Sequence, residues 1–185
     1  MRTPTLIRCF VVLAALACGP SFAIAAPTER GLLLGFGAGG GSAGVTGGEH
    51  RRGGTALGLS VGYVLHPEYA LALGTTGWTR TLEGQTVSFT VTGAEFDWYP
   101  RGGDFSVRAM AGLGRGMLST QSGYTLRYAG ESGLGLSAGL GYELRLARTL
   151  TLGPQTDFNW VVLDDATLRW WNGYVTLRWY PVLQK

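Results

Sequence analysis

The chain has 185 residues, enough for one domain, and combines 45% apolar residues and 31 glycines with only 15% charged residues. A soluble domain usually carries about 25% charged residues, so the composition disfavours a soluble enzyme. The formal net charge is +3. Without the leader residues Arg2 and Arg8, 13 basic residues remain against 12 acidic ones, a net charge of +1, which disfavours nucleic-acid binding.

The first 25 residues are typical of a secretory signal peptide. Arg2 and Arg8 give a positive start, residues 9–18 form a short apolar run, and Ala23-Ile24-Ala25 fits an A-x-A cleavage site. The run is too short for a membrane-spanning helix. We therefore expect a signal peptide at 1–25 and one exported domain at 26–185.

Both cysteines, Cys9 and Cys18, fall inside this leader, so the mature chain has no disulfide and no cysteine metal site. Lipidation at Cys18 is the alternative to simple cleavage. The preceding Ala15-Leu16-Ala17 resembles a lipobox, but its leucine stands one position late. We expect cleavage after Ala25.

From Gly31 onward, large apolar residues alternate with small ones, which is the period of a β-strand. In 55–65 the odd positions are mostly large and apolar, whereas the even positions are Ala, Gly, Ser, Gly and Val. The segment 133–146 repeats the pattern, and helical spacing fits neither. Strands are predicted at 31–42, 54–65, 69–81, 86–99, 105–119, 133–146, 149–162 and 167–180.

The connections between these strands are expected to alternate in length. Short turns are predicted at 66–68, 100–104 and 147–148, and longer loops at 43–53, 82–85, 120–132 and 163–166. Short periplasmic turns and longer external loops are typical of a bacterial outer-membrane barrel. Lipid offers no hydrogen bonds to the unpaired backbone groups at the edge of an open sheet, so the sheet is expected to close. The sequence therefore predicts an all-β fold, an eight-stranded antiparallel up-and-down transmembrane β-barrel.

Charged residues on the strands are expected inside this barrel, because an arginine facing lipid at mid-depth would cost about 2–4 kcal/mol. The alternation places seven of them in the lumen, mostly in its periplasmic half. We predict an ion-pair network there, formed by Glu95, Asp97, Arg108, Glu143, Arg145, Asp157 and Arg178.

Aromatic residues near the short turns predict a lower membrane girdle. The expected members are Tyr63, Tyr69, Trp98, Tyr99, Phe105, Tyr142, Trp179 and Tyr180. In the fourth strand the apolar positions change phase after Val91, so a β-bulge is predicted at Gly93 to turn Glu95 and Asp97 inward.

Many glycines are predicted to line the lumen: Gly35, Gly37, Gly39, Gly58, Gly62, Gly112, Gly114, Gly116, Gly135, Gly139 and Gly141. They would leave a cavity unless large side chains fill it from across. Eight strands enclose a space that side chains can fill. We expect Trp78, Trp170 and Tyr174 to fill it, with a narrow pore as the alternative.

The chain resembles the small OmpA/OmpX-like outer-membrane barrels in pattern. The resemblance lies in Gly139–Leu144 followed by Leu150–Leu152, in Phe96–Pro100 followed by Gly112–Gly114, and in the aromatic-rich segment Tyr174–Tyr180. The last segment is similar to their assembly signal, although Pro181–Lys185 follow it here. The resemblance implies the outer membrane as the location. It also implies lipid, lipopolysaccharide and the barrel assembly machinery as partners.

Catalysis is not expected. Some barrels of this size modify lipid A, and a hydrolase of that kind needs a serine activated by a histidine. His66 falls in a predicted periplasmic turn and His50 in the first loop, so they are expected at opposite ends and neither stands beside a strand serine. No metal or cofactor site is predicted.

A structural or surface-interaction role, in envelope integrity or adhesion, is therefore the predicted function. The alternatives are a narrow pore or ligand channel and, less favoured, a lipid A-modifying enzyme. Tyr124, Arg127 and Tyr128 in the predicted third loop are candidate contact residues, because exposed aromatic and arginine side chains suit partner binding. The extracellular partner is not specified by the sequence.

Overall fold

The computed structural model describes residues 30–45, 51–122, 125–164 and 166–181, so the predicted signal peptide and His50 lie outside the described residues. The strands are β1 (Gly31–Val45), β2 (Arg52–His66), β3 (Tyr69–Leu82), β4 (Gln85–Trp98), β5 (Phe105–Ser122), β6 (Thr125–Tyr142), β7 (Leu144–Ala147), β8 (Leu150–Val162) and β9 (Thr167–Trp179). One 3-10 turn, Pro100–Gly102, joins β4 to β5. No helix within these ranges is long and apolar enough to cross a membrane.

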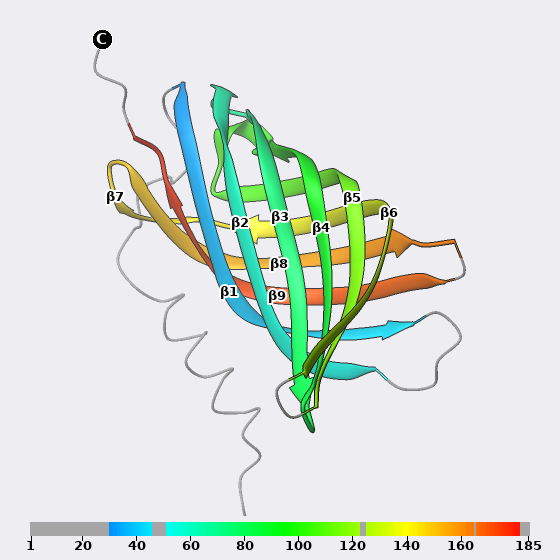
Figure 1. Cartoon of the computed structure of the whole chain (residues 1–185). Helices are drawn as coiled ribbons and strands as arrows, with labels where there is room; N and C mark the ends of the chain where they lie inside the picture. Colours follow the sequence, from blue (N-terminus) through cyan, green and yellow to red (C-terminus); the bar gives the residue numbers. More distant parts are fainter. Residues whose placement is uncertain (1–29, 46–50, 123–124, 165, 182–185) are drawn as a thin grey trace, which may run out of the picture.

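The strands form a closed antiparallel barrel (Figure 1). Each strand from β1 to β5 pairs with the next, β8 pairs with β7 and β9, and β9 pairs back to β1. The pairing of β6 with β8 closes the ring. Closure leaves no sheet edge within the wall, so the predicted fold class is confirmed.

The strands β6 and β7 act as one barrel strand. The pairs Gly141↔Gln155 and Leu144↔Leu152 keep one register, and only the two positions between them lack ladder pairs. Pro154 has no N–H to donate to the facing strand, which accounts for the gap. The barrel therefore has eight strands although the chain shows nine segments.

The outer face is apolar along most strands. Leu73 is 69% exposed and Val175 58% exposed, and aliphatic side chains on every wall resemble them. In water such a surface would cause aggregation, whereas in a bilayer it contacts acyl chains. The last strand has the same kind of outward face, since Trp171, Val175, Leu177 and Trp179 are all exposed.

The predicted bulge at Gly93 is wrong. The register runs through Gly74↔Gly93 and Gly93↔Gly112 without a shift, and odd-numbered residues of β4 face the lumen from Val87 to Asp97. The prediction assumed that large apolar residues always face lipid. Here the lumen near the loops is itself apolar, so Val87, Phe89 and Val91 point inward while threonines occupy the outer face.

The predicted third loop is also wrong. Residues 120–132 mostly continue β5 and β6, which pair as far as Ser122↔Thr125. The β3–β4 connection is likewise only Glu83-Gly84, and both have positive φ, as a two-residue hairpin turn requires. The polar residues of this segment predict a loop by composition, but pairing with the neighbouring strand keeps the backbone extended. At these two connections the predicted longer loops are therefore absent, because their residues extend the neighbouring strands instead.

Candidate functional site

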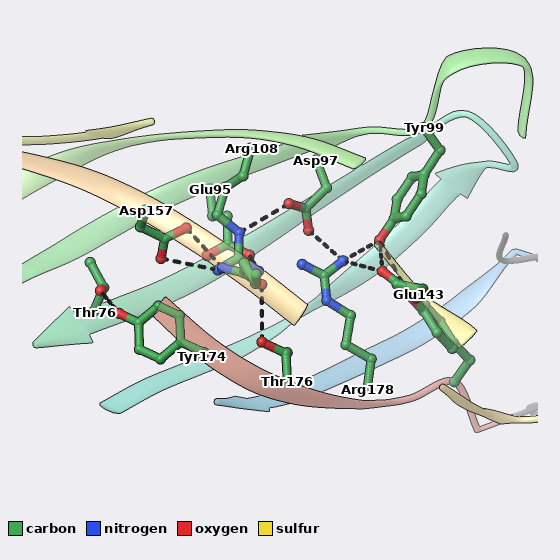
Figure 2. Close-up of polar contacts among 12 residues, drawn as sticks. Thr76, Glu95, Asp97, Tyr99, Arg108, Glu143, Asp157, Tyr174, Thr176 and Arg178 are labelled. Atoms are coloured by element: carbon green, nitrogen blue, oxygen red, sulfur yellow. Dashed lines mark hydrogen bonds and ion pairs between the residues drawn. The ribbon is translucent and has the colours of Figure 1, made fainter. Parts of the chain in front are cut away.

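The lumen near the turns holds a network of charged side chains from five of the eight barrel strands. Arg108 of β5 contacts Glu95 (3.2 Å), Asp97 (3.1 Å) and Asp157 (3.9 Å). Arg178 of β9 contacts Asp97 (3.2 Å) and Glu143 (2.9 Å). Asp97 therefore joins the two arginines across the lumen, as Figure 2 shows.

The register explains how these residues meet. Asp97 pairs with Arg108, Arg108 with Gly139, and Gly139 with Asp157, so the four stand in one row across β4, β5, β6 and β8. A Cβ at Gly139 would lie 2.2 Å from Asp157 Oδ1. The missing side chain therefore leaves the space through which Asp157 faces Arg108.

Six of the seven predicted network residues come together in this way and are almost fully buried. Arg145 is half-buried on β7 and lies opposite Thr151, nearer the turn end than Glu143. The four carboxylates and two guanidinium groups are removed from water, so the network's net stabilisation depends on how completely they pair.

Tyrosine and threonine hydroxyls complete the network around Glu143. Its Oε1 accepts from Tyr99 (3.0 Å), and its Oε2 accepts from Tyr180 and Thr151, both at 2.8 Å. Arg178 also donates to the Tyr99 hydroxyl. Charge-assisted hydrogen bonds of this kind are among the strongest available to a buried carboxylate.

Tyr99 and Tyr180 are corrections to the predicted girdle. Tyr99 is completely buried and Tyr180 half-buried, while the other six predicted members are exposed on the outer face. Each follows an outward tryptophan, Trp98 or Trp179, and neighbouring strand residues face opposite sides. Strict alternation past the strand ends would have placed both tyrosines in the lumen.

A second polar group lies midway along the lumen. Tyr174 hydrogen-bonds to Thr76 on the opposite wall, and Asn172 lies within hydrogen-bond distance of the Tyr174 hydroxyl (2.6 Å). Gln155 donates to Asp157 (2.9 Å) and accepts from Thr176 (3.2 Å), which links this group to the charged network. The sequence predicted Tyr174 as a filling residue but not its polar partners.

Apolar side chains cluster in the lumen near the loops instead. Phe89 packs against Trp78 with ring centroids 5.4 Å apart and against Trp170 at 5.7 Å. Trp170 is completely buried and Trp78 is 4% exposed, in one cluster with Val91, Val161, Met110 and Leu168. Glycines on the facing wall give these groups room, since a Cβ at Gly114 would lie 2.5 Å from Val161 Cγ2.

His66, the histidine within the described residues, is not part of the lumen network. His66 is exposed at the β2–β3 turn, where its Nδ1 accepts a hydrogen bond from the Glu68 amide (3.3 Å). Within the described ranges, no cluster of three or more His, Cys, Asp or Glu residues is arranged to hold a metal ion. Arg127 and Tyr128 belong to β6, and Tyr124 lies outside the described residues.

A closed eight-stranded barrel with an apolar exterior and a polar, charged lumen is an outer-membrane type of barrel. No protein-family model matches the sequence, and no curated protein matches it. Solved structures do share the fold. The Neisserial surface protein A structure is 16% identical, with a TM-score of 0.59 over 83% of this chain and 99% of that one.

The attachment invasion locus protein Ail of Yersinia pestis, solved in complex with the heparin analogue sucrose octasulfate, is also similar. It is 14% identical, with a TM-score of 0.62 over 82% of this chain and 99% of that one. At these identities the likeness establishes the fold. It is the fold of small outer-membrane barrels that the sequence resemblance implied, and it fits the predicted outer-membrane location.

Proposed function

We propose that this protein is a closed outer-membrane barrel that acts at the cell surface, in attachment or envelope integrity, and not as a pore. The observation that carries this proposal is the β5–β6 hairpin. The β6–β8 ladder begins at Leu134↔Val162, whereas β6 pairs with β5 as far as Thr125. Residues 125–133 of β6 are thus paired on one side only and extend past the neighbouring wall.

A strand edge of this kind offers a row of backbone donors and acceptors to a partner. The hairpin also carries Arg127 and Tyr128, and Tyr124 is close to its tip in sequence. Arginine and tyrosine are common anchors of protein contacts. We propose these three residues as surface-contact positions, with the turn end of the barrel in the periplasm and the hairpin outside the cell.

The filled lumen supports the absence of conduction. The charged network occupies the turn half and the aromatic cluster the loop half, so two different barriers stand in series along the axis. A narrow pore remains the second candidate because many lumen positions are glycine. The outer belt is proposed to contact lipid and lipopolysaccharide, with the assembly machinery as a partner during insertion.

Conduction is tested with the purified barrel in planar bilayers. We expect no openings of tens of picosiemens or more, the order expected for an open channel rather than a lumen filled by side chains. Arg178→Ala removes the guanidinium that joins Asp97 to Glu143, and it is expected to increase brief openings. Steady conductance of the unmodified protein would contradict the closed lumen.

Attachment is tested on whole cells that display the barrel, with immobilised heparin as the probe because the similar Ail structure holds a heparin analogue. We expect retention above that of cells without the protein, reduced several-fold by the double variant Arg127→Gln and Tyr128→Ala. Arg115→Gln is the matched control, since Arg115 is an exposed outward residue of β5. Equal retention of both variants would contradict a contact role for the hairpin.

A further inference from the structure

A cavity of about 420 Å³ opens at the loop end of the lumen, above the aromatic cluster. Its walls are the lumen-facing residues of β1–β4, among them Arg52, Arg80, Val87 and Phe89, and Glu83 lies on its rim. The volume is in the range of about 300–1,000 Å³ that small-molecule sites occupy. The packed rings of Phe89, Trp78 and Trp170 close its floor, so the cavity is a blind pocket.

The two arginines lie close together on adjacent strands. Arg80 donates to the carbonyl of Gly53 (3.2 Å), the residue that follows Arg52. Within the described residues neither arginine forms an ion pair, in contrast to Arg108 and Arg178 deeper in the lumen. Two neighbouring guanidinium groups without a carboxylate partner attract an anion.

The floor of the pocket contributes a second, independent feature. Trp78 lines the pocket and is 4% exposed, yet its indole Nε1–H has no hydrogen-bond acceptor. A buried donor without an acceptor is costly, and most such groups have a partner. The edge of the ring that carries Nε1 lies over Gly54, where a Cβ would come within 2.7 Å of it, so this donor lies against the wall of the pocket formed by the strand that also carries Arg52.

We propose that this pocket binds a small amphipathic monocarboxylate that enters from the aqueous side. The carboxylate contacts Arg52 and Arg80, and the aliphatic part covers Val87 and Phe89. Glu83 also lines the pocket without forming an ion pair with either arginine, and its negative charge favours a monoanion over a dianion. The strands β1–β4 separate the pocket from lipid, so the ligand comes from outside the cell and not from the bilayer.

Octanoate is a suitable probe, and the full-length mature barrel in lipid nanodiscs is a suitable sample. The readout is the assigned indole N–H signals in a two-dimensional ¹H–¹⁵N NMR spectrum. We expect a saturable shift of the Trp78 signal, with no matching shift of the lipid-facing Trp171. Acetate, which lacks the aliphatic part, and octanol, which lacks the charge, are each expected to bind at least about tenfold more weakly.

Arg52→Gln is the decisive variant, because Arg52 is exposed and has no hydrogen-bond partner within the described part of the chain, so folding is not expected to depend on it. It should weaken octanoate binding about tenfold. Arg169→Gln removes an equal charge from the outer face near the same end and should leave binding unchanged. The proposal is overturned if Trp78 shows no saturable shift, if Trp171 shifts with it, if octanol or acetate binds as tightly as octanoate, or if Arg52→Gln binds as the unmodified protein does.

Discussion

In the lumen near the turns, the strands bring together four carboxylates and two arginines, whereas near the loops they bring together aromatic and aliphatic side chains. Each half contains packed side chains, but the packing depends on different physical interactions. The charged half depends on each group meeting its partner, since one unpaired buried charge is costly. The stability of the apolar half depends on side-chain volume, since close packing against glycine leaves little room for a larger side chain. The two halves should therefore respond to different substitutions.

The largest effect is expected from breaking the charged half. Arg178→Met leaves Asp97 and Glu143 without one shared guanidinium, and removing one partner of a buried pair typically costs about 3–5 kcal/mol. The free energy of unfolding in lipid vesicles, measured by urea titration, checks this. Arg169→Met on the outer face is the control and should change that free energy little. A loss below about 1 kcal/mol for Arg178→Met would mean that the network is not a stabilising element.

A smaller effect is expected from overfilling the apolar half. Gly114→Val introduces a Cβ that would lie 2.5 Å from Val161 Cγ2. Overpacking of this kind costs about 1–3 kcal/mol. The same urea titration should show the loss, and adding Val161→Ala should restore part of it. Gly40→Ala is the control, because the closest atom to a Cβ there is 3.5 Å away. Failure of the second substitution to restore stability would argue against a volume-limited cluster.

The smallest effect is expected from removing one hydroxyl from the charged half. Tyr99→Phe keeps the ring but deletes the hydroxyl that donates to Glu143 and accepts from Arg178. A hydrogen bond to a charged group contributes about 1.5–3 kcal/mol at most, and Arg178 and Glu143 still contact each other directly. Because Tyr180 and Thr151 still donate to Glu143, we expect the free energy of unfolding to fall by about 1 kcal/mol. Tyr142→Phe also deletes a hydrogen bond to a carboxylate, that of Asp104, but in an exposed position, and should cost less. Equal losses in the two variants would show that burial does not strengthen the Tyr99 contact.

The amino-acid sequence by itself determined the number of strands and the inward position of the charges. Alternation has a period of two in any strand, and a charge cannot face lipid cheaply, so Glu95, Asp97, Arg108, Asp157 and Arg178 could be assigned to the lumen without coordinates. The reason given for Glu95 and Asp97 was nevertheless wrong, since no bulge lies at Gly93.

Only the tertiary structure determined which side chains face each other across the lumen. The register across four strands brings Arg108 to Asp157 past Gly139, and no local pattern contains that information. The same holds for the apolar upper lumen, because hydrophobicity alone does not distinguish a lipid-facing valine from one packed against a glycine across the barrel. Tyr99 and Tyr180 are different, because strict alternation past the strand ends is enough to place both in the lumen. A side chain's surroundings depend on contacts between distant segments, and those contacts exist only when the barrel closes.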